Sequence, residues 1–336
     1  MSQQLTTVPL GLNLGLWDRM SSWDDTLEIA RLADELGYDC LLIPESFGRD
    51  GVSLCDRLLA ATSRIKVCFG IANVFSRSPA VLASTAATLD ELSGGRFILG
   101  LGGSTPNLVE GWHGLQFKAP LARTRETIEI CRRIWARDPS PYAGRFFQTG
   151  GIKLAFQPLR AEIPIWQGAV LQNGLNLCGE LADGWIPANL PTECIEWGRE
   201  LMAAADSERA VSINPTFQLA VHEDPAQILP IVKFGIAMYY GQSTSPYARA
   251  AAALGYADDV AALQAAYSEG GSQQATAEVS DRLAESVGIV GSLTQCRERV
   301  GQLLGAGADR LVVTMPAPTR AECEPILEGI IPDHYR

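Results

Sequence analysis

Histidine and closely spaced cysteine are scarce in this sequence. It has three histidines, and its eight cysteines never form a C-x-x-C motif. Zinc sites and disulfide frameworks both need clustered ligands or regular cysteine spacings, so neither is expected here. We therefore predict a protein without bound metal that resides in a reducing compartment, the cytoplasm.

Basic charge and long apolar runs are also lacking. The 27 lysines and arginines are outnumbered by 38 acidic residues, for a net charge of −11. That balance argues against nucleic acid and against an anionic membrane surface as partners. No apolar run reaches the ~18 residues of a spanning helix, and the first residues lack the basic and apolar regions of a secretory signal. A small-molecule substrate is the expected partner.

Glycine and apolar residues are plentiful, with 32 glycines and 47% hydrophobic residues. Short apolar runs alternate with longer amphipathic stretches, which is typical of strands that alternate with helices. The predicted strands are residues 10–16, 39–43, 65–71, 97–101, 163–167, 184–186, 216–221 and 310–314. Helix-start signals at Ser22, at Ser78 before Pro79, and at Ser292 with Gln295 support the helices between them.

The alternation predicts an α/β protein whose parallel strands form an eight-stranded β/α (TIM-type) barrel, with residues 1–336 as one domain. A doubly wound open sheet is the alternative, but no G-x-G-x-x-G follows the first strand. Residues 224–288 are too long for one connection and predict a helical insertion between strand seven and its helix. We expect a lid over the barrel mouth; a second structural subdomain is the alternative.

In such a barrel the site lies at the carboxyl ends of the strands. The side chains there are mostly aromatic, amide or small, which suits a flat and partly apolar ligand held by backbone groups. The residues concerned include Trp17, Glu45, Ser46, Phe47, Ala72, Asn73, Gly102, Gly103, Ser104, Glu110, Trp112, His113, Gly168, Ala169, Pro187, Ala188 and Asn189.

Four of these features have two interpretations each. Residues 100–104 (GLGGS) either bring the backbone close to a ligand, as an anion-binding nest, or form a tightly packed turn. Glu45 follows an apolar run, so it is either a general acid in the mouth or an acceptor for backbone amides of the next loop. His113 is either a proton shuttle or a solvated loop residue. Gly168 and Ala169 either present helix-terminal amides to a phosphate or precede an ordinary N-cap at Asn173.

Several sequence segments resemble those of the bacterial-luciferase-like superfamily. They are residues 33–39 (ADELGYD), 88–97 (TLDELSGGRF), 100–102 (GLG) and 182–185 (ADGW). Residues 109–114 (VEGWHG), 120–126 (PLARTRE) and 305–311 (GAGADRL) are similar to the branch that uses the deazaflavin coenzyme F420.

The resemblance implies a β/α barrel, a homodimer, and a cofactor at the mouth: F420, or FMN in the alternative. It implies a bulge with a non-prolyl cis peptide at the end of strand three, by position Ala72–Asn73. Relatives often have an acidic residue and then histidine after strand two, whereas this chain has Glu45 and Ser46. The acid-base role is therefore assigned to Glu45, with His113 and Glu110 in reserve.

The remaining roles follow from the same resemblance. Trp17, Phe47 and Trp112 would form walls around the substrate. The cofactor would be held by Ser46, Ala72, Asn73, Gly102, Gly103, Ser104, Gly168 and Ala169. Its anionic tail would need a basic patch, for which Arg49, Arg77 and Lys118 are the candidates.

The function expected is that of an F420-dependent oxidoreductase, which moves a hydride between the deazaflavin and a small organic substrate. That substrate would carry an activated C=C, C=N or C=O, or the corresponding alcohol. A reduced-FMN-dependent monooxygenase of the same fold is one alternative. A non-catalytic protein that binds a flavin or deazaflavin is the other.

Overall fold

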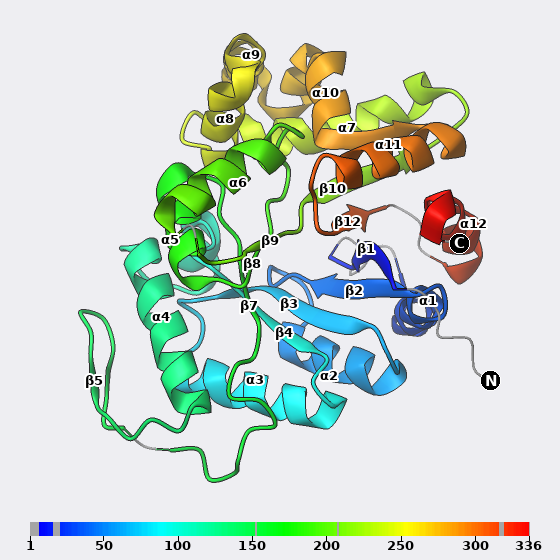
Figure 1. Ribbon diagram of the computed structural model, residues 1–336. Helices are drawn as coiled ribbons and strands as arrows, with labels where there is room; N and C mark the ends of the chain where they lie inside the picture. The colour runs from blue at the N-terminus through cyan, green and yellow to red at the C-terminus, as the bar shows by residue number, and fades with distance from the viewer. Residues whose placement is uncertain (1–6, 16–20, 152, 207, 316–318, 336) are drawn as a thin grey trace, which may run out of the picture.

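Strands and helices alternate along the first part of the chain (Figure 1). The structure is a computed structural model that describes residues 7–15, 21–151, 153–206, 208–315 and 319–335. The first elements are β1 (Val8–Asn13), α1 (Trp23–Glu35), β2 (Tyr38–Ile43), α2 (Gly51–Ala61), β3 (Lys66–Asn73), α3 (Pro79–Ser93), β4 (Phe97–Gly102) and α4 (Pro120–Trp135). A π-helical turn, Asn107–Trp112, lies between β4 and α4.

The second part continues the alternation and adds short strands. Its elements up to the seventh predicted strand are β5 (Tyr142–Ala143), β6 (Gln148–Thr149), β7 (Ile165–Gln167), α5 (Gln172–Leu181), β8 (Gly184–Trp185), α6 (Cys194–Ala205), β9 (Ser212–Ile213) and β10 (Thr216–Val221). The rest are α7 (Pro225–Tyr240), α8 (Pro246–Ala251), α9 (Ala257–Glu278), α10 (Asp281–Val287), β11 (Gly288–Gly291), α11 (Leu293–Gly305), β12 (Leu311–Thr314) and α12 (Arg320–Gly329).

The predicted helix starts are confirmed. Ser22 accepts a hydrogen bond from the backbone of Asp25, and Ser78 caps α3 with Pro79 in its first turn. Ser292 and Gln295 form a reciprocal capping box at α11. These side chains satisfy backbone N–H groups that have no partner inside the helix, so the short sequence signals fix where the helices begin.

The prediction of eight strands is wrong in its count. In the described residues the main sheet has ten strands in the order β11-β10-β12-β1-β2-β3-β4-β7-β8-β9, while β5 and β6 form a separate antiparallel pair. All eight predicted strands occur. The two additional strands of the main sheet are β9, with two residues, and β11, with four, and runs this short carry little periodic signal. Every pairing in the main sheet is parallel, which gives an α/β fold with a curled parallel sheet.

The two faces of the sheet are packed differently. One face is covered by helices and contributes to the main core, which contains Leu99, Phe217 and Val313. The other face forms a smaller cluster of Cys40, Leu42, Cys68, Ile98, Trp166, Ile186 and Val312, with Ile71 packed against it. Since side chains of a strand alternate between faces, this smaller cluster marks the inner side of the curled sheet.

The segment between β10 and β11 is helical throughout most of its length, and the structure describes all of it. Helices α7 to α10 and a π-helical turn, Ala252–Tyr256, occupy it. They surround a hydrophobic cluster of their own that includes Val232, Tyr240, Leu263 and Leu283. In Figure 1 these helices gather beyond α6 and α11, away from α2 and α3.

Candidate functional site

Glu45 lies just after β2 and joins the loops that follow β2 and β3. Its Oε2 atom accepts hydrogen bonds from the backbone N–H of Asn73 at 3.0 Å and from the hydroxyl of Ser76 at 3.2 Å. Its Oε1 atom forms an ion pair with Arg77. Only 11% of the Glu45 side chain and 18% of the Arg77 side chain are exposed. Both carboxylate oxygens are therefore engaged by donors.

Arg77 is the centre of this polar network. Its second terminal nitrogen lies 3.1 Å from Asp50 Oδ1, and its guanidinium lies 5.4 Å from the centre of the Phe69 ring. Burial alone would raise the pKa of Asp50, but hydrogen bonds from Ser53 and the charge of Arg77 hold it below its usual value. Arg77 is thus bound within the protein, contrary to its predicted place in a basic patch for an anionic tail.

The end of β3 carries a bulge, with a cis peptide bond between Gly70 and Ile71. The prediction of a bulge with a cis bond in this strand is confirmed, but its position at Ala72–Asn73 is wrong by two residues. The register between β3 and β4 shifts between Phe69 and Ala72, so the irregular residues are the two before Ala72.

The side chain of Ile71 forms an apolar surface at the inner side of the sheet, which we call the Ile71 shelf. A Cβ atom at Gly102 would lie 2.2 Å from Ile71 Cδ1, and one at Gly168 would lie 3.1 Å from Ile71 Cγ2. These two glycines, at the ends of β4 and β7, make room for the Ile71 side chain. Gly103 makes room for Pro120 in the same way, with a distance of 2.6 Å.

Asn73 holds a buried polar atom without a partner beside this shelf. Its side chain is 1% exposed, and its Oδ1 atom accepts from the backbone of Phe75 at 2.9 Å. That bond fixes the amide so that Nδ2 has no hydrogen-bond partner among the described residues. Since buried polar groups are normally paired, this donor marks a place for a ligand atom or a water. Ala72, in contrast, is fully buried in the main core.

The loop after β4 brings together most of the remaining predicted residues. Ser104 adopts a left-handed conformation with φ of 58°, which is uncommon for residues other than glycine and is enriched at functional sites. Trp112 is 60% exposed, and its ring contacts Phe47 edge to face at 5.8 Å between centres. The two predicted wall residues are therefore adjacent, although they come from different loops.

His113 and Glu110 differ in their environments. The Nε2 atom of His113 is buried and has no hydrogen-bond partner among the described residues, which disfavours a simply solvated histidine. Glu110 is exposed, and its Oε1 atom accepts from the backbone of Phe117 at 3.1 Å. Of the three acid-base candidates, His113 is the one with an unoccupied buried polar atom.

The start of α5 differs from the sequence prediction. The N-cap is Leu171, whose side chain makes no capping hydrogen bond, so the alternative with Asn173 as N-cap is wrong. Leu171 has an extended backbone and takes the position that a capping side chain would normally fill. Ala169 is partly buried, and its carbonyl accepts from the Trp185 indole at 2.8 Å.

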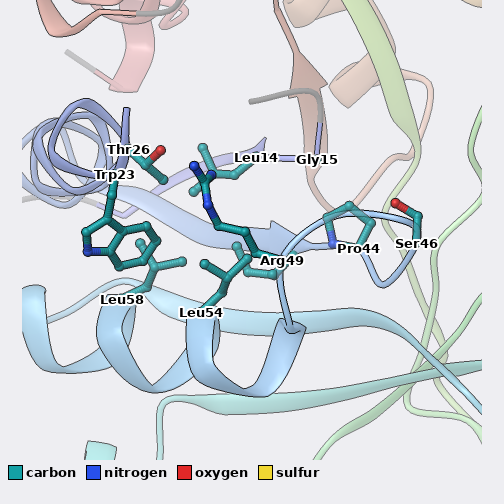
Figure 2. A pocket seen from close by; sticks show the side chains of 10 residues that line it. Leu14, Gly15, Trp23, Thr26, Pro44, Ser46, Arg49, Leu54 and Leu58 are labelled. Carbon is teal, nitrogen blue, oxygen red and sulfur yellow. The ribbon is translucent and has the colours of Figure 1, made fainter. Parts of the chain in front are cut away.

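Ser46 and Arg49 line a small cavity beside the loop after β2 (Figure 2). Arg49 extends in this view between Leu14 and Leu54, while Ser46 lies at the end away from Trp23. The cavity measures about 20 Å³, enough for one water but not for a cofactor. Trp17, the third predicted wall residue, lies outside the described residues.

Asn189 and Ile71 differ in how far the sequence predicts them. Asn189 belongs to residues 187–189, which are predicted to lie at the site after the sixth strand; it has a left-handed backbone with φ of 52°, and its carbonyl accepts from the Tyr240 hydroxyl at 2.8 Å. The shelf residue Ile71 is identified by the sequence only as the end of an apolar strand, and nothing in the sequence singles it out as part of the site.

The described residues contain no group of three or more metal-ligating side chains. No helix within the described part of the chain combines the length and hydrophobicity needed to cross a membrane.

Comparison with known proteins adds the family. The model of the luciferase-like monooxygenase family matches residues 7–310. A putative coenzyme F420-dependent oxidoreductase of Mycobacterium tuberculosis is 32% identical over 328 residues, which cover 91% of this chain and 94% of that protein. A 5,10-methylenetetrahydromethanopterin reductase of Archaeoglobus fulgidus is 29% identical over 298 residues, covering 85% of this chain and 88% of that protein.

The fold has close counterparts among solved structures. The coenzyme F420-dependent tetrahydromethanopterin reductase of Methanopyrus kandleri superimposes with a TM-score of 0.81 at 22% identity. The match covers 98% of this chain and 100% of that one. At this level of identity the likeness establishes the fold.

Proposed function

Because this chain belongs to the luciferase-like monooxygenase family, we propose that it is an F420-dependent oxidoreductase acting on a small organic substrate. The observation that carries the proposal is the Ile71 shelf at the ends of β3, β4 and β7, with the unpartnered Nδ2 donor of Asn73 beside it. The relative of 32% identity, named as F420-dependent, supports this cofactor over FMN.

The residues at the shelf fit a flat, heteroatom-rich ring. Ile71 offers an apolar surface for one ring face, and the buried amide of Asn73 offers a hydrogen bond to a ring carbonyl or nitrogen. Backbone groups of Gly102, Gly103, Ser104, Gly168 and Ala169, with the hydroxyl of Ser46, would complete the cofactor contacts. When bound, reduced F420 supplies a hydride, and its oxidised form accepts one.

The protein's own groups would orient the substrate, exclude water and move a proton. Phe47 and Trp112 lie edge to face and would shield the reacting centre from solvent. His113 is our first candidate for proton transfer because its Nε2 atom is buried without a partner among the described residues. Glu110 remains a second candidate. Glu45 remains a third, although both its oxygens are engaged by donors.

The test is a pair of titrations of the purified protein, one with F420 and one with FMN, followed by cofactor fluorescence. We expect saturable F420 binding that weakens at least tenfold in an Asn73→Ala variant and changes little in Val81→Ala. Tight FMN binding without F420 binding would contradict the proposal. Oxygen consumption that depends on reduced FMN would then favour a monooxygenase. Cofactor binding without any turnover would favour a non-catalytic binding protein.

The finer fold assignments are also proposals. Strands β9 and β10 are separated only by Asn214 and Pro215; β9 pairs with β8, whereas β10 pairs with β12. If β9 and β10 are one interrupted strand, that strand pairs with β8 on one side and with β12 on the other. Because β12 also pairs with β1, the sheet then closes into the TIM-type barrel. A single domain over residues 1–336, an insertion at 224–288, a homodimer and a cytoplasmic location remain proposals.

A further inference from the structure

Helix α7 lies over the inner face of the sheet. In the parallel ladder of β10 and β12, Thr216 pairs with Val312 and Gln218 with Thr314. Val312 belongs to the cluster on the inner side, so Gln218 faces inward as well. A Cβ atom on Gly235 of α7 would lie 2.3 Å from the Gln218 amide nitrogen. Helix α7, which follows the carboxyl end of β10, therefore packs over the inner face of the sheet at this strand.

One side of α7 next to Gly235 is apolar and exposed. Of the residues three or four positions from Gly235, Val232 is buried, whereas Ile231, Met238 and Tyr239 are 51%, 54% and 46% exposed and form the exposed stripe. The neighbouring Phe234 is 48% exposed. The one charged residue of α7, Lys233, is paired with Asp281 at 2.5 Å. Contiguous exposed apolar surface of this kind marks a binding face.

A second apolar rim lies on the loops after β2 and β4. Phe47, Trp112 and Leu115, on the loops after β2 and β4, are 54%, 60% and 44% exposed. The strands are parallel, so these loops and the shelf lie at the same edge of the sheet. The acidic groups nearby are engaged, Glu45 by Arg77 and Glu110 by the Phe117 backbone.

We propose that the two apolar rims select the substrate, and that it is an uncharged molecule with an extended apolar body of more than about six carbons. The α7 stripe and the Phe47–Trp112 pair hold that body, while the reducible group lies at the shelf. This substrate class rests on the proposed function for the reaction, but the apolar site itself is independent of any cofactor. The side chains named for the two rims carry no charge, and Arg49, two residues after Phe47, lines the cavity beside Leu14 and Leu54.

The experiment measures equilibrium binding without cofactor. Calorimetry on the full-length protein compares 2-butanone, 2-hexanone and 2-nonanone with nonanoate as the charged probe. We expect affinity to rise about fourfold per methylene, which is the ~0.8 kcal/mol of a buried CH₂ group, and nonanoate to bind at least tenfold more weakly than 2-nonanone. Affinity that is independent of chain length, or equal for nonanoate, would overturn the proposal.

Matched variants locate the site. Ile231→Ser and Met238→Ser should each weaken 2-nonanone binding at least fivefold and leave 2-butanone unchanged, whereas Trp112→Ser should weaken the binding of both ketones. Val81→Ser on α3, where Val81 is 52% exposed, is the control and should change neither. If Met238→Ser instead alters sedimentation without changing ketone binding, the stripe is an interface between copies, and the proposal fails. F420 titration of the same variants keeps a failure of the proposed cofactor separate from a failure of this site.

Discussion

The carboxylate of Glu45 connects three positions at the carboxyl end of β2 and β3: the Asn73 backbone, the Ser76 hydroxyl and the Arg77 guanidinium. Replacing it by glutamine would leave Arg77 without its nearest counter-charge and put an amide donor opposite other donors. We expect Glu45→Gln to lower the free energy of unfolding by about 2 kcal/mol and to weaken F420 binding through the displaced Asn73. Urea denaturation and F420 titration measure the two effects.

Asp50→Asn is the control for that variant, because Asp50 also contacts Arg77 but makes no bond to Asn73. It should destabilise the start of α2 and leave F420 affinity unchanged. Glu45→Gln could instead retain its stability and its F420 affinity while turnover falls about 100-fold or more. That result would contradict the structural role and show that Glu45 is a general acid.

Among the helices and loops, Asp34 ties the last turn of α1 to the segment before β3. It accepts hydrogen bonds from the backbone of Ser63, Arg64 and Ile65 at 2.8, 3.0 and 2.7 Å. Burial alone would raise the pKa of Asp34, but these bonds outweigh it and lower the pKa below its usual 3.8. A lowered pKa in the folded state stabilises the protein above the unfolded-state pKa, and the stabilisation is lost as the pH falls through the folded value.

Asp34→Asn should therefore cost about 2 kcal/mol at neutral pH, and the difference from the native protein should shrink below about pH 4. Urea denaturation at several pH values measures this. Asp56→Asn, at an exposed position of α2, is the control. A difference that stays constant down to strongly acidic pH would refute the role of the ionised carboxylate.

The β5–β6 hairpin depends on one carboxylate of α4. Glu126 is 6% exposed and accepts from the backbone N–H groups of Arg145, Phe146 and Phe147 at 2.8 to 3.2 Å. Glu126→Gln removes part of this acceptor set, so we expect faster proteolysis and hydrogen exchange at 142–149, with other elements unaffected. Glu180→Gln, in an exposed pair with Arg125, is the matched control. Unchanged exchange in the hairpin would contradict the assignment.

Local signals account for what could be predicted from the sequence. Ser22, Ser78 and Ser292 identify helix starts because capping involves residues three apart, and the strand runs are short apolar stretches between them. The site could be predicted only as a set of strand ends. The pair of Glu45 with Arg77 spans 32 residues, and the burial of His113 Nε2 depends on the loop around it, so neither leaves a periodic or spacing signal.

Across the whole molecule, two hydrophobic cores adjoin, and the hydrogen bonds between them gather at Asn189, Thr192 and Glu193. Leu263 belongs to the cluster of helices α7 to α10 and Leu99 to the main core, and both are essentially fully buried. Between the two parts, the Tyr240 hydroxyl donates to the Asn189 carbonyl at 2.8 Å, and the Ser286 hydroxyl donates to Glu193 at 2.8 Å. Ala250 of α8 lies in the main core, but most buried side chains of α7 to α10 lie in their own cluster. A part with a core of its own can open without unfolding the rest.

A cavity made in one core should therefore speed hydrogen exchange in a different set of elements than a cavity made in the other. Truncating a buried leucine to alanine costs about 2–5 kcal/mol. We expect Leu263→Ala to speed hydrogen exchange throughout 225–287 while β1 to β4 stay protected, whereas Leu99→Ala should speed exchange everywhere. Leu263→Ala should also weaken 2-nonanone binding, because α7 contributes the apolar stripe, and leave F420 binding at the Ile71 shelf unchanged. Equal acceleration of exchange in both parts by Leu263→Ala would instead show one cooperative unit, since a cavity in a shared core would destabilise every strand alike.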